Sequence, residues 1–283
     1  MTPLRAQMIE AMRMHGFAVR THQTYLMAVS ELARYHHRCP STLGREELEA
    51  WFRHLVIERA LAPASCRVYL NAVRFLFVQV LQRPSFEVAV TLPSKPQRIP
   101  ELLTRAEVGR IVEQCRNPKH RALLLTCYGC GLRVSELVAL QVADIDPERH
   151  LLRVTQGKGA KDRMVILGAG LLGELRAYWR AYRPWRWLFC GQRPDVSLGI
   201  NTAQRVFKRA KARAQVERIG GIHSLRHAYA THQLEAGLPV HLLQRLLGHR
   251  SIHSTLRYVH WVPGYRDGGT GHADLIGALE TAR

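Results

Sequence analysis

The chain has 283 residues and no run of about 20 consecutive apolar residues, which excludes an ordinary membrane-spanning helix. Its 41 lysines and arginines outnumber its 22 aspartates and glutamates, so its formal net charge is +19. Such an excess is typical of proteins that bind a polyanion, above all a nucleic acid, although an unusually basic soluble protein or one that meets an anionic membrane surface would share it.

Residues 1–90 carry a helical pattern throughout, in which apolar residues recur at the spacing of one helix face. Helices are expected at residues 25–35, 46–58 and 64–81. Ser41 and Thr42 are candidate start signals for the second of these helices, and Pro63 precedes the third. The segment is therefore predicted to be a small helical bundle, whose many exposed arginines and histidines would contact DNA or face solvent.

A linker and a second domain are expected next. Residues 91–100 contain three prolines and lack helical periodicity, which predicts an extended interdomain linker. Thr104 and Glu107 have the spacing of a capping box, in which the two side chains accept hydrogen bonds from free N–H groups at a helix start. The second domain is therefore expected to cover residues 101–283, including a C-terminal tail.

The second domain is predicted to be mixed. Residues 151–155 and 162–167 have the pattern of two short strands joined by a glycine-containing turn. Helices are expected at residues 120–128, 133–140, 171–182, 202–214, 225–235 and 239–247. Gly237 and Gly248 stand where helix C-caps belong. The predicted fold class is accordingly mainly α with a small antiparallel β-sheet: an N-terminal helical bundle followed by a mixed α+β domain.

Cys127 and Cys130 form a C-x-x-C pair, a pattern that can indicate a zinc or redox site. No second cysteine or histidine pair stands at a suitable spacing, so we interpret the two as buried structural thiols and predict no metal. The six cysteines are too scattered for a disulfide framework, and the N-terminus lacks the apolar segment of a signal peptide. Both features favour an intracellular protein.

Several residues could act on a phosphodiester. Without a metal, that chemistry needs an oxygen nucleophile, cations for the non-bridging oxygens and an acid for the departing oxygen. Arg133 stands at a predicted helix start, where it could hold a phosphate, and Glu136 could orient its guanidinium. Lys158 lies between two glycines at the hairpin tip. Taken alone, these would be a surface ion pair and a solvated turn lysine.

A second group of candidates stands near the C-terminus. His223, Arg226 and His227 have the spacing i, i+3, i+4 and would share the first turn of a helix. His249 is expected on a bend after a C-capping glycine, and Tyr258 stands nine residues further on. Taken alone, each has an ordinary structural explanation, such as a polar helix end or a core aromatic.

The ordered set resembles the tyrosine recombinase (phage integrase) family. The run GLRVSEL at residues 131–137 matches the first motif of that family, and the resemblance covers nearly the whole chain. It implies a SAM-like core-binding domain at residues 1–90 and a tyrosine recombinase catalytic domain at residues 101–283. No arm-binding module is expected ahead of the first domain, so the chain is most similar to simple Xer-type and transposon- or integron-associated recombinases.

The resemblance implies a role for each candidate. Tyr258 would attack the scissile phosphate and form a 3′-phosphotyrosine link, leaving a free 5′-hydroxyl. Arg133 and Arg226 would bind the non-bridging oxygens. His223 would assist removal of the tyrosine proton, and His249 would donate a hydrogen bond to the phosphate. An unperturbed phenol has a pKa near 10, so at neutral pH it needs a proton acceptor and a positive environment.

Lys158 would act as the general acid for the leaving 5′-oxygen, with Lys161 as the competing candidate. The covalent link conserves the energy of the broken bond, so neither a cofactor nor a metal is implied. In this family four protomers exchange strands through a Holliday junction. The implied partner is therefore double-stranded DNA with paired half-sites, bound by a homotetramer. Residues 272–280 form an amphipathic segment that would be donated in trans or would pack on its own domain.

The expected function is site-specific recombination, for the integration, excision or transposition of a mobile element, in the bacterial cytoplasm at the nucleoid. Chromosome-dimer resolution remains a further possible use. A type IB topoisomerase would share the nucleophile and the cations, and a DNA-binding relative that lost catalysis would share the fold. The target DNA sequence is not legible from the chain, because it depends on base contacts and on DNA deformability.

Overall fold

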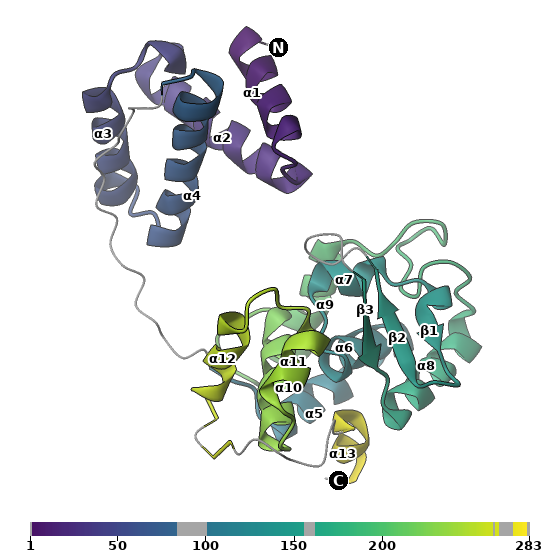
Figure 1. Ribbon diagram of the computed structural model, residues 1–283. Coiled ribbons are helices and arrows are strands. Elements are labelled where there is room, and N and C mark those ends of the chain that lie inside the picture. The colour runs from purple at the N-terminus through teal and green to yellow at the C-terminus, as the bar shows by residue number, and fades with distance from the viewer. Residues whose placement is uncertain (1, 84–100, 156–161, 263, 266–273, 282–283) are drawn as a thin grey trace. The chain divides into compact units, whose positions relative to one another are not determined.

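The computed structural model describes residues 2–83, 101–155, 162–262, 264–265 and 274–281 (Figure 1). The chain divides into two compact units, Met1–Arg98 and Ile99–Arg283. The segment predicted as a linker, residues 91–100, lies outside the described residues. Within the described ranges, no helix combines the length and the apolar character that crossing a membrane requires.

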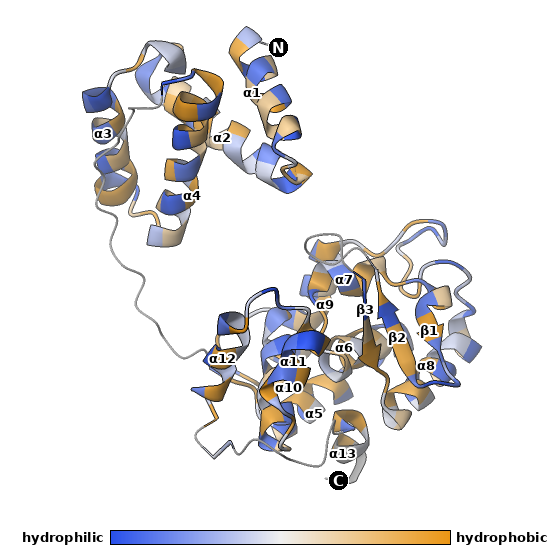
Figure 2. Ribbon diagram, viewed as in Figure 1, coloured by the Kyte–Doolittle hydropathy of each residue, from blue (hydrophilic) through white to orange (hydrophobic). Residues whose placement is uncertain are grey.

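The first unit is helical, as predicted. Its helices are α1 (Pro3–Met14), α2 (Val19–His36), α3 (Arg45–Arg53) and α4 (Pro63–Arg74). Helix α3 continues into the π-helical turn η2 (His54–Glu58), and α4 continues into the π-helical turn η3 (Phe75–Val80). Each of these helices carries both apolar and polar residues along its length (Figure 2), as expected for helices with one buried face. Trp51, Phe52 and Phe77 are among the fully buried side chains of its core.

The start of α3 differs from the prediction. Ser41 and Thr42 lie in a separate 3₁₀ turn, η1 (Pro40–Thr42), and do not cap α3. Pro40 at the first position of this turn favours a tight turn of its own, ahead of the helix. The N-cap of α3 is Gly44, whose N–H donates a 2.8 Å hydrogen bond to the Glu47 carboxylate.

The second unit is mostly helical with one small sheet. Its helices are α5 (Arg105–Glu113), α6 (Pro118–Gly129), α7 (Val134–Ala139), α8 (Ala169–Tyr182), α9 (Ile200–Arg213), α10 (His223–Glu235), α11 (Val240–Leu247), α12 (His253–Val259) and α13 (Leu275–Thr281). The strands are β1 (Ile145–Asp146), β2 (Leu151–Val154) and β3 (Arg163–Ile166). They pair antiparallel in the order β1-β2-β3, with Leu152 opposite Val165.

The predicted hairpin is confirmed as β2 and β3, and β1 extends it by a third strand. The predicted capping box is also present, because the Thr104 N–H donates to Glu107 over 2.8 Å and the Glu107 N–H donates back to the Thr104 hydroxyl over 3.2 Å. Gly248 ends α11 in the left-handed conformation, with φ of 63°. These three predictions were correct because each structure depends only on residues that are close together in the sequence.

Helix α6 lies in the core of the second unit. Its residues 122–129 are all buried, and it packs against α8 and α10. Cys127 and Cys130 are part of this core, and burial raises the pKa of each thiol to about 12. The prediction that the two thiols are buried is confirmed.

The C-terminal helix α13 packs on its own unit, against α5, α6, α8 and α10. Figure 1 shows it beside α5. Leu275 and Ile276 are buried, and the Asp274 carboxylate accepts a 3.0 Å hydrogen bond from the Gly170 N–H of α8. The contact is close, because a Cβ added at Gly170 would lie 2.8 Å from the Gly277 nitrogen.

Candidate active site

The described candidates meet at one place in the second unit, although they come from four separate segments. Arg133 is the N-cap residue of α7, and Arg226 lies in the first turn of α10. His249 follows the end of α11, and Tyr258 lies in α12. Helices α10, α11 and α12 pack on one another (Figure 1), which brings these side chains together. Lys158 and Lys161 lie outside the described residues.

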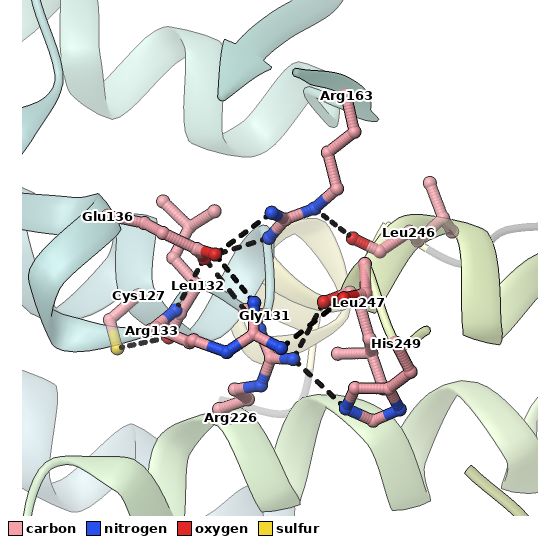
Figure 3. Close-up of polar contacts among 11 residues, drawn as sticks. Cys127, Gly131, Leu132, Arg133, Glu136, Arg163, Arg226, Leu246, Leu247 and His249 are labelled. Atoms are coloured by element: carbon pink, nitrogen blue, oxygen red, sulfur yellow. Dashed lines mark hydrogen bonds and ion pairs between the residues drawn. The ribbon is translucent and has the colours of Figure 1, made fainter. Parts of the chain in front are cut away.

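Glu136 is the centre of the charged groups (Figure 3). Its carboxylate accepts hydrogen bonds from the Arg133 backbone N–H at 2.9 Å and from the Arg133 guanidinium at 2.7 Å. Both Nη atoms of Arg163 also donate to it, at 2.9 and 2.8 Å, and Arg226 lies 3.8 Å away. Burial alone would raise the pKa of Glu136, but Arg163 and Arg133 outweigh burial and hold that pKa at about 2.

This cluster has an excess of positive charge. Three guanidiniums surround the single carboxylate of Glu136, and Glu136 is only 5% exposed. In a partly buried place, cations that outnumber their anionic partner bind a further anion strongly, because the charges are poorly screened. Guanidiniums match the geometry of phosphate oxygens in particular. The cluster is thus suited to a phosphate group.

Arg226 is held rigidly, with only 1% of its surface exposed. Its guanidinium donates to the carbonyl oxygens of Gly131 and Leu247, each over 2.7 Å, and to His249 Nε2 over 3.1 Å. The bend at Gly131 requires glycine, because its φ is +59° and a Cβ there would lie 2.3 Å from the Tyr229 ring. Burial, followed by the charge of Arg133, lowers the pKa of Arg226 to about 10, which leaves it charged at neutral pH.

His249 is neutral in this environment. Burial, followed by the charges of Arg226 and Arg133, lowers its pKa to about 3. Its Nε2 lies 3.1 Å from the Arg226 guanidinium, which only donates, and its Nδ1 lies 2.9 Å from the Thr255 hydroxyl. Nε2 is therefore the acceptor and Nδ1 carries the proton. As predicted, His249 lies outside the helix, directly after the left-handed Gly248.

Tyr258 is buried, with 3% of its surface exposed. Its ring lies parallel to the His249 ring at 6.3 Å and edge-on to Trp261 at 5.1 Å. Burial raises the pKa of the Tyr258 phenol, and the nearby charge of Arg226 opposes this shift only in part. The phenol is therefore protonated at neutral pH and needs a proton acceptor before it can act as a nucleophile.

That hydroxyl contacts a histidine to which the sequence analysis gave no role. The Tyr258 hydroxyl lies 2.9 Å from Nδ1 of His227, the residue directly after Arg226. The ring of His223 packs edge-on against the His227 ring, with centroids 4.7 Å apart. The i, i+4 spacing placed both histidines on one helix face, but it could not indicate which of them reaches the tyrosine.

Arg163 was missed altogether by the sequence analysis. It opens β3, and besides its two bonds to Glu136 it donates from Nε to the Leu246 carbonyl over 2.8 Å. A Cβ at Gly248 would lie 3.0 Å from the Arg163 side chain, so this arginine also packs against the bend that carries His249. Its partners are far away in the sequence, and a strand pattern does not reveal such partners. Its position directly after the lysine-bearing turn of the predicted hairpin was the available signal.

Replacement of Arg163 by methionine is expected to destabilise the protein by about 3 kcal/mol, because it removes one partner of a buried ion pair. Arg163→Lys should recover only part of this loss, since a lysine cannot form the two-pronged contact with Glu136. Chemical denaturation measures both changes. Arg193→Met is the control: Arg193 and Asp195 are 76% and 48% exposed in their ion pair, so its loss should cost about 1 kcal/mol or less. Equal losses of stability in Arg163→Met and Arg193→Met would contradict the assignment.

Among the described residues, no group of three or more His, Cys, Asp or Glu side chains has the arrangement of a metal site. What this site presents is a buried phenol beside a cluster of cations. In a mainly helical chain with a small antiparallel sheet, a phenol among cations suits chemistry on a phosphodiester.

The comparison with known families agrees. The profile of the phage integrase family matches residues 101–263, and that of the phage integrase N-terminal SAM-like domain matches residues 4–87. The chain belongs to the phage integrase family and is a site-specific recombinase of the tyrosine type. The predicted fold class and family resemblance are thereby confirmed.

Individual relatives cover most of the chain. A Sinorhizobium fredii protein named as a putative integrase/recombinase is 42% identical over 260 residues, which are 92% of this chain and 84% of that protein. Tyrosine recombinase XerA of Pyrococcus furiosus is 36% identical over 171 residues, 59% of each chain. Among solved structures, a lambda integrase dimer bound to a COC′ core site has the same fold, with a TM-score of 0.72, 21% identity, and coverage of 88% of this chain and 94% of that chain.

Proposed function

We propose that this recombinase binds paired half-sites on double-stranded DNA and exchanges strands through a 3′-phosphotyrosine link at Tyr258, to integrate, excise or transpose a mobile element. The observation that carries the proposal is the position of the phenol. Tyr258 is buried between His227 and His249, and the latter ring is hydrogen-bonded to Arg226. The nucleophile thus stands beside the cations that would hold its target phosphate.

The cluster supports specific roles. Arg133 and Arg226 bind the two non-bridging oxygens, and Glu136 keeps both guanidiniums in place. His249 donates a hydrogen bond to the phosphate once its Nε2 carries the proton. His223 assists removal of the tyrosine proton by holding in place the His227 ring, against which it packs edge-on. Fixing these groups before the substrate arrives lowers the barrier, because little reorganisation remains to be done during the reaction.

Lys158 protonates the leaving 5′-oxygen in this proposal, as its position between the two glycines of the hairpin suggests. In this step the Tyr258 oxygen bonds to phosphorus, the bond from phosphorus to the 5′-oxygen breaks, and the 5′-hydroxyl departs. The phosphotyrosine link keeps the energy needed for the reverse step. Attack by a 5′-hydroxyl from another strand completes an exchange.

Incubation with nicked suicide duplexes in EDTA tests the function. The duplexes are tiled from the DNA that flanks the gene, so that they include the ends of its element. A covalent protein–DNA adduct that survives denaturation is expected on at least one of them. Failure to form an adduct on any duplex would contradict the proposal, and relaxation of supercoils without exchange between two molecules would favour a topoisomerase.

We also propose that four protomers act together and that α13 passes to a neighbouring protomer in the DNA complex. The support is the close fit of its docking site, which is built around glycines. A Cβ at Gly129 would lie 3.1 Å from Ile276, and one at Gly170 would lie 2.8 Å from the Gly277 nitrogen. A second copy of the same chain offers the same helix to the same site, as a cyclic assembly requires.

Gly170→Ala is expected to abolish complexes of paired sites while a single half-site is still bound, because the added methyl group excludes α13 from its docking site. Native gel electrophoresis with labelled half-sites distinguishes the two species. Gly173→Ala is the matched control on the same helix, because nothing lies within 4 Å of a Cβ at that position. Paired complexes that form equally well with both variants would show that α13 takes no part in assembly.

A further inference from the structure

The contact between His227 and Tyr258 joins two helices at the reacting atom. His227 lies in the first turns of α10, Tyr258 lies in α12, and these helices pack against each other. The distance from His227 Nδ1 to the phenol oxygen is 2.9 Å, a normal hydrogen bond. The two rings are 5.6 Å apart and tilted by 48°, so the nitrogen approaches the hydroxyl rather than the ring face.

The surroundings of His227 keep it neutral. On its own helix it faces His223 and Arg226, and from the α12 segment it faces Arg257, Tyr258 and the ring of Trp261. Burial above all, with the charges of Arg226 and Arg257 adding to it, lowers the pKa of His227 to about 4. At neutral pH the ring is uncharged. Of the two neutral tautomers, the one protonated on Nε2 leaves Nδ1 free to accept a hydrogen bond from the phenol.

We propose that His227 is the proton acceptor for Tyr258 in the cleavage step. This inference rests on the proposed function and adds a catalytic residue to it. As the phenol oxygen bonds to phosphorus, its proton moves to His227 Nδ1, while the departing 5′-oxygen takes a proton from Lys158. When the strand is rejoined, the 5′-hydroxyl attacks phosphorus and the tyrosine oxygen leaves, taking its proton back from His227.

Geometry favours His227 over His223 for this role. His227 reaches the hydroxyl directly, whereas His223 packs edge-on against the His227 ring. Burial of His223, and then the charges of Arg226 and Arg133, lower the pKa of His223 as well, so both histidines are neutral. The difference between them is therefore one of position, and single substitutions can separate the two.

The test compares His227→Ala, His227→Asn and His223→Ala in single-turnover adduct formation on a suicide duplex, from pH 7 to pH 9. Wild-type cleavage should hardly change with pH, since its acceptor is neutral throughout. His227→Ala should be slower by about 10²- to 10³-fold at pH 7, as expected for loss of a general base. Its rate should rise almost tenfold per pH unit, because hydroxide then removes the proton, and added imidazole should restore part of the rate.

His227→Asn separates proton transfer from positioning. The amide oxygen of asparagine can accept the phenol hydrogen bond at nearly the same place as Nδ1, but it cannot take up the proton. The Asn variant should therefore be as slow and as pH-dependent as the Ala variant. Wild-type rates with a flat pH profile in the Asn variant would overturn the proposal and leave only a positioning role.

One further outcome would overturn the proposal, and another would contradict the proposed function on which it rests. A steep pH profile in His223→Ala together with a flat one in His227→Ala would assign the proton to His223 and overturn the proposal. If the wild type itself forms no adduct on any duplex, the proposed function fails before His227 is tested. Thermal unfolding of each variant separates a slow folded enzyme from a misfolded one.

Discussion

A Tyr258→Phe protein is expected to form no covalent adduct with DNA and no recombinant product, while it keeps its fold and its affinity for DNA. The substitution removes one oxygen, and that oxygen is the proposed nucleophile. The ring can keep its place beside His249 and Trp261, because its contacts with them are ring contacts that do not need the hydroxyl. Loss of the hydrogen bond to His227 should reduce stability by only about 1 kcal/mol.

The measurement is adduct formation on the suicide duplex, with DNA binding followed in parallel by gel shift. Tyr182→Phe is the control, since Tyr182 is exposed on α8 and this variant should cleave like the wild type. An adduct formed equally by Tyr258→Phe would move the nucleophile to another residue. Loss of DNA binding in the same variant would leave the chemistry undecided, and for this reason both quantities are measured on one preparation.

Glu136→Gln is expected to destabilise the second unit by about 3 to 5 kcal/mol and to abolish most of the activity. The glutamine keeps the shape of the side chain but leaves the buried charges of Arg133, Arg163 and Arg226 without their counter-ion. Mutual repulsion would then spread the guanidiniums that are proposed to hold the phosphate. Glu148→Gln removes a charge from an exposed turn and should change stability by less than about 0.5 kcal/mol.

The pH dependence of stability checks the same assignment. The pKa of Glu136 is lowered from 4.5 to about 2 in the folded protein, so its ionised form stabilises the fold. This contribution is complete above about pH 4.5 and is lost as the pH falls towards 2. The stability difference between wild type and Glu136→Gln, measured by denaturation, should therefore shrink as the pH falls from about 4.5 to about 2. A constant difference over that range would show that Glu136 is not ionised in the way proposed.

Much of the fold could be predicted from local patterns. Helices of the first unit, the hairpin and the capping box at Thr104 follow from residue spacing and from hydrogen bonds between near neighbours. Strand β1 could not be predicted, because two residues are too few to show an alternating pattern. Helix α12 was also missed as a helix, since its seven residues carry few apolar positions and it is held by packing on α10 and α11.

The site was predictable where the chemistry depends on residue type and order. Arg133, Glu136, Arg226, His249 and Tyr258 were all named from the sequence, and the structure brings them together. Contacts that depend on how separate segments pack were not predictable.

Two contacts illustrate this limit. Arg163 reaches Glu136 and the end of α11 only after β3 has packed against that helix. His227 reaches Tyr258 only because α10 and α12 lie against each other. A periodicity can place a residue on a helix face, but it carries no information about which neighbour that face will meet.

The wide spacing along the chain of the groups around Glu136 has a consequence for synthesis. Arg133 leaves the ribosome early in the second unit, whereas Arg226 and Tyr258 follow only near its end. A nascent chain therefore holds neither the completed cluster of cations nor the phenol that works with it. Under the proposed mechanism, the chain gains its nucleophile, Tyr258, only when translation is nearly finished.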